Sequence, residues 1–274
     1  MEIHWTSGQE QRLNEFNTPH ADSVFETAEE RDRCFASLMR ENESHSRREI
    51  CAMLNSPIRA NLAQLEADLA AALISKGFTE VKTPTIISKS ALEKMTITED
   101  HPLYRQVFFI DKKRCLRPML APNLYVIMKN LRSVRKGPIR FFEIGSCFRK
   151  ESHSSRHLEE FTMLNLVEMG PEGEPIDNLR EHIATVMDTV GLDYELEREE
   201  SDVYRETLDV TVDGIELASG AVGPHPLDPA HGIHEPWCGV GFGLERLLTL
   251  RSGANNIRRS GRSLVYLNGE RMDL

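Results

Sequence analysis

Arg149 and Glu151 carry opposite charges where a polar loop separates two apolar stretches. Residues 143–148 and 161–169 are both β-prone, so the segment predicts a hairpin with Arg149 and Glu151 ending one strand and Phe161 starting the next. A cation for phosphate, an acceptor for an amino group and an aromatic face for a base are what an adenine nucleotide needs. The hairpin therefore predicts nucleotide binding, and an ordinary exposed hairpin with mixed charges is the alternative.

A second candidate site begins at Trp237, where glycines stand at alternate positions, Gly239, Gly241 and Gly243, and Arg246 follows. Alternating glycines leave one face of a strand without side chains, so a flat ligand can lie against the backbone. Arg246 opens the helix that follows and can reach back over that bare face. A closely packed glycine-rich strand without a ligand explains the spacing equally well when it is taken alone.

Three histidines, His225, His231 and His234, lie in one loop among prolines and aspartates. Three imidazoles could bind zinc, but their spacing matches no standard zinc pattern and no cysteine joins them closely. The sequence therefore leaves metal binding by this loop open and does not favour it.

Apolar periodicity predicts the elements that must hold these residues in place. The clearest helix covers residues 59–76, where leucines recur at helical spacing and a glycine follows. Asp213-Gly214 is a strong signal for a two-residue hairpin turn between strands at 208–212 and 216–222. The other predicted elements are strands at 78–84 and 194–196, a hairpin of 107–110 with 113–117, and helices that cover 26–40, begin at 117 and cover 176–190.

Composition excludes several classes of protein. The chain has 274 residues, of which 40% are hydrophobic and 28% charged, as in a globular protein with a core of its own. No apolar run approaches the ~20 residues of a membrane span, and the N-terminus lacks the basic and apolar regions of a signal peptide. The five cysteines are widely spaced and never form a Cys-x-x-Cys pattern. We therefore expect free thiols, a cytoplasmic location and no membrane partner.

The charges are distributed unevenly along the chain. The net charge of -10 argues against a protein that coats nucleic acid through its overall charge. Residues 129–150 nevertheless contain seven Lys or Arg against one acid, and residues 246–262 contain five arginines and no acid. Basic clusters on an acidic protein are typical of a selective RNA binder, and a solvated helix face is the alternative for either cluster.

The Arg-x-Glu hairpin followed by Phe161 resembles the second signature motif of the class II aminoacyl-tRNA synthetases, and the glycine strand with Arg246 resembles the third. The helix at 59–76 and the strand ending at Pro84 resemble the first motif, which builds the dimer interface in that superfamily. Five strings are similar to the pyrrolysyl-tRNA synthetase family: residues 116–125, 148–152, 157–165, 241–248 and 266–269. The resemblance implies an α+β fold in which a mainly antiparallel sheet is flanked by helices.

The similarity runs from about residue 50 to the C-terminus. It implies a class II catalytic domain at residues 56–274 and a helical extension at residues 1–55 that packs on it. Some members of the family carry a separate N-terminal tRNA-binding domain, and this chain resembles the compact forms without one.

The resemblance implies that ATP and Mg²⁺ bind beside the hairpin. Arg149 and Glu151 would hold the phosphate and the adenine amino group, while Phe161 and Arg246 would sandwich the base. The implied ATP-binding residues are Arg149, Glu151, His157, Leu158, Phe161, Met163, Glu216, Leu217, Ser219 and Arg246, with Arg149 and Arg246 catalytic. Glu216 and Ser219 would also hold Mg²⁺, which prefers oxygen ligands. Without the resemblance, Glu216 is a plain acid at a strand edge.

Most residues of the implied amino-acid pocket are apolar. It would consist of Leu124, Tyr125, Met128, Asn165, Val167, Tyr204, Ser219, Trp237 and Gly239. Taken singly, most of these are better explained as core residues. Asn165 is a polar amide in an apolar strand and must be satisfied if buried; the resemblance gives it the amide carbonyl on the ε-nitrogen of pyrrolysine. The family varies at Val167 and Ala218, and Gly220 replaces an expected alanine, so these positions bear on pocket width.

The implied activity is ATP-dependent activation of pyrrolysine and its transfer to an amber-suppressor tRNA(Pyl) by a homodimer. We expect the tRNA body to contact the basic helix near residues 132–136, the N-terminal helices and the pair Arg258-Arg259. One alternative is a class II-like ligase that activates another amino acid or modifies a protein. Another is a non-catalytic paralogue that serves as a binding subunit. Such paralogues often lose the motif arginines, whereas Arg149 and Arg246 are both present here.

Overall fold

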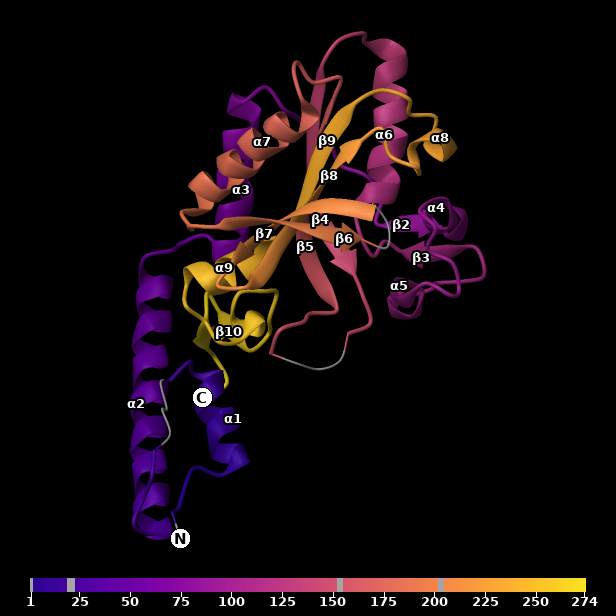
Figure 1. Cartoon of the computed structure of the whole chain (residues 1–274). Coiled ribbons are helices and arrows are strands. Elements are labelled where there is room, and N and C mark those ends of the chain that lie inside the picture. The colour runs from indigo at the N-terminus through magenta and orange to yellow at the C-terminus, as the bar shows by residue number, and fades with distance from the viewer. Residues whose placement is uncertain (1, 19–22, 152–154, 202–204) are drawn as a thin grey trace.

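The computed structural model describes residues 2–18, 23–151, 155–201 and 205–274, which fold around one large sheet (Figure 1). The helices are α1 (Ser7–Glu15), α2 (Ala28–Asn55), α3 (Asn61–Ser75), α4 (Lys89–Lys94), α5 (Pro102–Gln106), α6 (Ala121–Val134), α7 (Pro175–Val190), α8 (Asp228–His231), α9 (Leu244–Arg251) and the 3₁₀ helix η1 (Ile257–Arg259). The strands are β1 (Thr79–Glu80), β2 (Ile86–Ser88), β3 (Arg114–Leu116), β4 (Ile139–Phe148), β5 (Glu160–Met169), β6 (Glu195–Ser201), β7 (Arg205–Val212), β8 (Ile215–Gly223), β9 (Trp237–Gly243), β10 (Tyr266–Leu267) and β11 (Glu270–Arg271).

The central sheet has the strand order β1-β4-β5-β9-β8-β7-β6. Only β1 pairs parallel with its neighbour β4, and the other neighbouring strands of this sheet are antiparallel. The predicted α+β fold with a mainly antiparallel sheet is therefore confirmed. The predicted hairpin of β4 and β5 pairs continuously from Ile139 with Met169 to Phe148 with Glu160. This long ladder holds both ends of the polar loop at one end of the sheet.

Helices α3 and α7 lie side by side over one face of the sheet (Figure 1). Leu65, Leu69 and Leu73 recur every four residues along α3, so they share one helix face and are fully buried. They join a core cluster that includes Leu166 of β5 and Phe242 of β9. Burying a leucine of this kind contributes roughly 1.5–3 kcal/mol relative to exposing it. We call this side the helix-covered face.

The opposite face, which we call the open face, is covered at one end only. There Tyr125 and Met128 of α6 pack with Phe141, Val167 and Trp237 in a second cluster. Val167 lies near the end of β5 and Trp237 begins β9, so the cluster occupies the end of the sheet at which β5 finishes. The part of this face nearer the start of β5 is left for a cavity.

Several local signals hold in the structure. Asp213 and Gly214 have φ values of 51° and 72°, the left-handed pair that the predicted two-residue turn requires. Gly191 follows α7 at φ 77°, where a side chain would be strained. Pro122 lies in the first turn of α6, where its missing N–H costs nothing.

The hairpin predicted for residues 107–117 is present but short. An antiparallel bridge joins Phe109 to Cys115, with backbone hydrogen bonds between the two segments on either side of it. At the turn, Oδ1 of Asp111 accepts the backbone N–H groups of Lys113 and Arg114. β3 also pairs with β2 on its other edge.

The strand predicted at residues 78–84 is also shorter, and only β1 pairs with β4. Past β1, the backbone N–H of Thr83 is donated to Oε1 of Glu143 rather than to the ladder.

The N-terminal helices pack against the C-terminal segment rather than on the sheet (Figure 1). Helix α2 continues well beyond the predicted residues 26–40 and extends away from the sheet. Ser46 of α2 donates to Glu270 Oε2 at 2.7 Å, and Arg259 Nη1 donates to the carbonyl of Glu15 at 2.8 Å. The boundary between residues 55 and 56 stays a prediction. Within the described ranges, no helix is both long enough and apolar enough to cross a membrane.

Candidate active site

Three neighbouring strands bring the candidate residues into register on the open face. Asn165 of β5 lies opposite Gly241 of β9, which in turn lies opposite Ser219 of β8. One step along the same face, Val167 lies opposite Gly239. Because side chains alternate along a strand, these residues project to the same side.

Two adjoining cavities collect almost all of the residues expected from the sequence. A cavity of about 300 Å³ is lined by Arg149, Glu151, His157, Leu158, Phe161, Met163, Glu216, Leu217, Ser219 and Arg246, the full set expected for ATP. A narrower pocket of about 50 Å³ is lined by Leu124, Tyr125, Met128, Asn165, Val167, Ser219, Trp237 and Gly239, expected for the amino acid. Tyr204 lies outside the described residues. Asn165 and Ser219 line both cavities, which therefore meet at these two side chains.

Arg149 is held at the mouth of the larger cavity by its own strand end and by the segment before α6. Its Nε donates to the carbonyl of Pro118 at 2.9 Å, and its guanidinium lies 5.2 Å from the ring centre of Phe161. Burial lowers the pKa of Arg149, and the positive charge of Arg246 acts in the same direction. A guanidinium remains charged despite such a shift, so two cations face one cavity.

A buried ion pair supports this arrangement, and sequence reasoning missed it. Arg117, taken as the start of a helix, instead has a fully buried guanidinium whose Nη1 donates to Glu143 Oε1 at 2.8 Å. Gly145 makes room for it, since a Cβ there would overlap Arg117 Nη2. The carbonyl of Arg117 accepts the backbone N–H of Phe148 at 3.0 Å, next to Arg149. The signal was Glu143, a charged residue in an otherwise apolar strand.

Arg246 lies in the first turn of α9, directly after the glycine strand. Its Nη1 donates to the carbonyl of Glu216 at 2.8 Å, which ties the start of α9 to β8 across β9. Gly243 has only the Cβ of Arg246 within 4.0 Å of where its own Cβ would be, so the backbone there is open. The expected bare surface is thus present beside Arg246.

The other two glycines of β9 line the cavities, and each is also closely approached by a neighbouring group. A Cβ at Gly241 would lie 2.8 Å from Nδ2 of Asn165, and a Cβ at Gly239 would lie 2.9 Å from the carbonyl of Leu166. These glycines make room for the pocket wall, and they add no side chain to the cavities that they line. A side chain at either position would displace Asn165 or the neighbouring strand.

A β-bulge turns Glu216 and Ser219 to the same face. Residues three apart on a regular strand point to opposite faces, but the β7–β8 register shifts between Val210 and Thr211. Glu216 therefore lies opposite Thr211, and Ser219 lies opposite Asp209. Both oxygen-bearing side chains consequently line the larger cavity.

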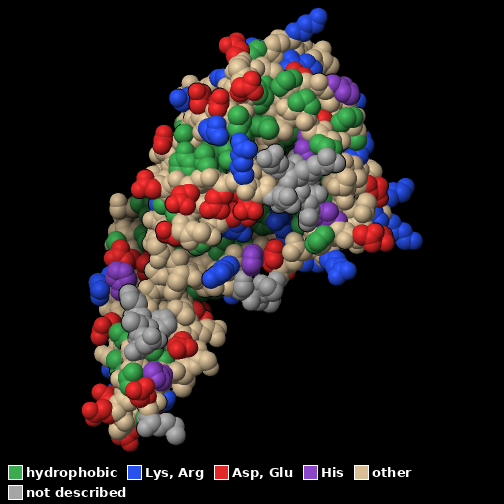
Figure 2. Space-filling model, in the orientation of Figure 1, with side chains coloured by type: hydrophobic (Ala, Val, Ile, Leu, Met, Phe, Trp, Pro, Cys, Tyr) green, Lys and Arg blue, Asp and Glu red, His purple; other side chains and the backbone are tan. Residues whose placement is uncertain are grey.

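Asp209 is a site residue that the sequence did not reveal. Ser219 Oγ donates to Asp209 Oδ1 at 2.7 Å. Burial raises the pKa of Glu216, and the negative charge of Asp209 adds to the rise, against the opposing effects of Arg246 and Arg149. In Figure 2, acidic side chains form a band over β6 and β7, above a hollow that contains Lys, Arg and His side chains. Clustered carboxylates thus face clustered cations.

Asn165 is a polar residue in a mostly apolar pocket, which Ser219 also lines. Its Oδ1 is buried and has no hydrogen-bond partner among the described residues. Of the positions considered for pocket width, Val167 lines the pocket, whereas Gly220 faces Leu179 of α7 on the helix-covered face. Ala221, not singled out from the sequence, lines the pocket instead.

The histidine loop does not form a metal centre in the described residues. His231 stacks on Tyr125 with ring centres 4.0 Å apart, and the backbone N–H of His225 donates to Asp228. The described group whose atoms have metal-ligand spacing is different: Glu168, His182 and Cys238, buried beneath α7. In that group Glu168 is already bonded to His182 and to Arg140.

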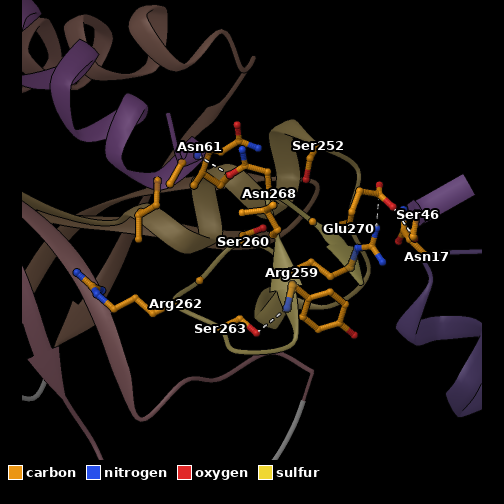
Figure 3. Close-up of a pocket in the computed structure, with 18 of the residues that line it drawn as sticks. Asn17, Ser46, Asn61, Ser252, Arg259, Ser260, Arg262, Ser263, Asn268 and Glu270 are labelled. Atoms are coloured by element: carbon orange, nitrogen blue, oxygen red, sulfur yellow. Dashed lines mark hydrogen bonds and ion pairs between the residues drawn. The ribbon is translucent and has the colours of Figure 1, made fainter. Parts of the chain in front are cut away.

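A third, larger cavity of about 880 Å³ lies between α2, α3 and the C-terminal segment (Figure 3). Most of its lining residues are polar, and the backbone N–H of Asn61 donates to Asn268 Oδ1 across it at 2.8 Å. Arg259, expected to meet tRNA, is committed to internal contacts with Glu15 and with the ring of Tyr266. Its neighbour Arg258 is exposed.

Comparison with known proteins assigns the chain to one family. The model of the tRNA synthetase class II core domain (F) matches residues 52–266. The structure of pyrrolysyl-tRNA synthetase from Desulfitobacterium hafniense is 47% identical with a TM-score of 0.94, covering 100% of both chains. A structure of PylSc, a pyrrolysyl tRNA synthetase of the same organism, is 46% identical with a TM-score of 0.91, covering 99% of this chain and 96% of that one.

More distant similarity extends to other synthetases of the class. A threonine–tRNA ligase of Wolbachia pipientis is 36% identical over 98 residues, which are 34% of this chain. The matched part spans only 15% of that ligase. The match to the class II core and the full-length match to two pyrrolysyl-tRNA synthetases agree. The chain therefore belongs to the class II aminoacyl-tRNA synthetases and, within them, to the pyrrolysyl-tRNA synthetase family.

Proposed function

We propose that this protein activates pyrrolysine with ATP and transfers the aminoacyl group to the cognate amber-suppressor tRNA(Pyl). The observation that carries the choice of amino acid is Asn165, an amide in an apolar pocket whose buried Oδ1 has no partner among the described residues. A secondary amide offers one C=O and one N–H, which complement a carboxamide side chain. Pyrrolysine carries such an amide on its ε-nitrogen, whereas lysine and phenylalanine do not.

The proposed first step takes place where the two cavities meet. The α-carboxylate oxygen of the amino acid attacks the α-phosphorus of ATP, the bond to the β-phosphate oxygen breaks, and pyrophosphate leaves with the released electron pair. Arg149 and Arg246 line the larger cavity and would stabilise the negative charge that develops on phosphate oxygens. No side-chain acid or base is required, so positioning and charge stabilisation carry the reaction.

The residues around Ser219 fit a Mg²⁺ ion. Because the Ser219 hydroxyl donates its only proton to Asp209, its lone pairs remain available to a cation. Glu216 adds a carboxylate on the same face. These two oxygen-bearing side chains, with phosphate and water oxygens completing the coordination shell, suit Mg²⁺. When bound, the ion would neutralise phosphate charge, and Glu216 and Ser219 would hold it while Asp209 orients the serine.

The amino-acid pocket must widen to accept this substrate. Its volume of about 50 Å³ is far below the ~300–1,000 Å³ typical of small-molecule sites. Selection by a deep apolar pocket requires no editing, because pyrrolysine is much larger than the standard aliphatic amino acids whose discrimination is limited to about 1–3 kcal/mol per methylene.

ATP–pyrophosphate exchange tests the proposal directly. Exchange should appear with pyrrolysine or another Nε-acylated lysine and stay at background with lysine and phenylalanine. Exchange with a standard amino acid would leave the fold assignment intact but would show that the pocket is assigned to the wrong substrate. No exchange in folded protein that still binds ATP would favour the non-catalytic paralogue. Loss of exchange with the acylated lysine in Asn165→Ala, with ATP binding intact, would support the amide contact.

We further propose that the protein acts as a homodimer and that tRNA contacts its exposed basic residues. Arg135, Lys136 and Arg258 are exposed, whereas Arg132 is paired with Glu235. Contacts to phosphate release counterions, so tRNA affinity should fall as salt rises from low to moderate concentration. An affinity independent of salt would contradict the RNA surface, and a monomeric mass at micromolar concentration would contradict the dimer.

A further inference from the structure

Asp228 is a buried carboxylate at the start of α8, behind the amino-acid pocket, with only 1% of its surface exposed. Its Oδ1 accepts a hydrogen bond from Oη of Tyr125 at 2.9 Å, and its Oδ2 accepts one from Nε1 of Trp237 at 2.8 Å. The backbone N–H of His225 donates to Oδ2 at 2.6 Å. One carboxylate thus accepts hydrogen bonds from two aromatic side chains of the pocket, Tyr125 of α6 and Trp237 of β9.

The position of Asp228 determines what the pocket presents to a ligand. Tyr125 and Trp237 line the pocket, whereas Asp228 does not. Their hydroxyl and N–H groups are therefore bonded on the side away from the ligand, and the rings offer carbon surface to it. Without an acceptor behind them, two buried donors would have to seek partners inside the cavity. Asn165 then remains as a polar group of this pocket that can bind an amide of the ligand.

Packing fixes the two rings in these orientations. Trp237 lies directly against Gly223, where any Cβ would overlap the indole. Tyr125 stacks on His231, with ring centres 4.0 Å apart and an interplanar angle of 18°. The two aromatic rings themselves meet edge to face at 6.1 Å. Since the pocket must widen to bind a large amino acid, this anchored wall is the part expected to stay in place.

We propose that Asp228 is a specificity-determining positioning residue: it holds the Tyr125 hydroxyl and the Trp237 N–H outside the pocket, and so creates a rigid apolar wall for an acyl group on the lysine ε-nitrogen. The ligand in this statement rests on the proposed function. The anchoring of the two rings does not.

Asp228→Asn is the direct test. The two rings donate to different oxygens of Asp228, and asparagine replaces one of these oxygens with an NH₂ group that donates, so one ring loses its acceptor. In ATP–pyrophosphate exchange, the KM for an Nε-acylated lysine should rise about tenfold while the KM for ATP changes less than about twofold. The preference for an apolar acyl group over a hydroxylated one of equal length should fall. Adding Tyr125→Phe removes one donor and should recover part of the KM.

Glu168→Gln is the matched control, because Glu168 is also a buried, hydrogen-bonded carboxylate but lies on the helix-covered face. It should lower the melting temperature without changing the amino-acid KM or the acyl preference. If Asp228→Asn behaved like this control, with a lower melting temperature and unchanged KM values and preference, Asp228 would be a structural residue only and the proposal would be overturned.

Fluorescence gives a readout that needs no activity. The chain has two tryptophans, so Trp5→Phe leaves Trp237 as the single emitter. In that background Asp228→Asn should shift the emission maximum, and Glu168→Gln should not. If Asp228→Asn does not fold, Tyr125→Phe alone should raise the amino-acid KM severalfold, and an unchanged KM would overturn the proposal. If the wild-type protein showed no ATP–pyrophosphate exchange, the proposed function would be wrong. The shift in the emission maximum would still test whether Asp228 anchors the Trp237 ring.

Discussion

Glu168 and Glu216 are carboxylates on opposite faces of the same sheet, and their pKa values move in opposite directions. Burial alone would raise the pKa of Glu168, but hydrogen bonds from His182 and Arg140 outweigh it and the pKa is lowered. Burial raises the pKa of Glu216, and the adjacent Asp209 raises it further. On the helix-covered face a charge is compensated by the fold itself. On the open face, the charge of Glu216 is one that we propose a ligand compensates.

The two faces therefore divide stability from function. Charges on the helix-covered face satisfy one another, as expected of buried polar groups in a core. The open face holds Arg149 and Arg246 near a cluster of carboxylates, with the buried Oδ1 of Asn165 at its centre. Groups with perturbed pKa values cluster at functional sites, which supports the proposal that substrates bind on the open face. Removing a charge should consequently affect activity on one face and folding on the other.

Arg246→Ala should have the largest effect. We expect the ATP–pyrophosphate exchange rate to fall roughly 100-fold, because a cation that stabilises phosphate charge is lost. The melting temperature should change little, since Arg246 makes one exposed hydrogen bond to the carbonyl of Glu216. Arg251→Ala, at an exposed position of the same helix, is the control. A near-normal rate in Arg246→Ala would remove its proposed role at the nucleotide.

Glu168→Gln should show the converse behaviour. Replacing a buried carboxylate that serves both His182 and Arg140 should lower the free energy of unfolding by about 2 kcal/mol. The exchange rate of the folded protein should stay within about twofold of wild type. Chemical denaturation followed by fluorescence measures the first, and Glu181→Gln on the exposed side of α7 is the control. If Glu168→Gln lost exchange activity without losing stability, the helix-covered face would contribute to activity, contrary to this prediction.

The features that the sequence predicts best are local. Leucine spacing predicts α3, the turn Asp213-Gly214 predicts the β7–β8 hairpin, and apolar, β-prone stretches predict β4 and β5. Each depends on neighbouring residues only, so no tertiary information is needed. The residues carried over from the resemblance line the two cavities, apart from Tyr204, which is not described.

The features that the sequence misses depend on contacts between distant segments. Counting back from Asp213-Gly214 would place Asp209 opposite Ala218, but the bulge places it opposite Ser219, and no residue type announces a bulge there. Glu143 is a sequence signal of a buried charge, but neither segment reveals that its partner is Arg117. The identity of a buried partner is a property of packing, so it could not be read from either segment alone.

Glu216→Gln should raise the Mg²⁺ concentration needed for half-maximal exchange by about tenfold. It removes the negative charge from a proposed ligand but keeps an oxygen and the size of the side chain. Direct Mn²⁺ titration in the presence of a non-hydrolysable ATP analogue should show the same weakening without turnover. Glu197→Gln on β6, whose carboxylate accepts from Thr211 rather than lining the cavity, is the matched control. Equal Mn²⁺ affinity in both variants would exclude Glu216 as a ligand.

The smallest expected effect is the pH dependence of folding stability. It is also the most specific, because its sign differs between Glu168 and Glu216 on the two faces. Glu168 contributes stability above its unfolded-state pKa, and this is lost as pH falls through its lowered pKa. The raised pKa of Glu216 has the opposite consequence: its contribution is present below its unfolded-state pKa and is lost as pH rises through the raised value. Without Mg²⁺ or ATP, Glu216→Gln should therefore be slightly more stable than wild type near neutral pH.

Thermal unfolding of both variants between about pH 4 and about pH 7 measures this contrast. Both differences from wild type should widen as pH rises, Glu168→Gln lying below wild type and Glu216→Gln above it. Solvent around the exposed Glu216 should keep its gain within about 0.5 kcal/mol. Saturating Mg²⁺ and ATP should reverse the order for Glu216→Gln, because the ligand binds the wild-type carboxylate more tightly. A gain that persisted with ligand would mean that the charge at position 216 serves neither folding nor binding.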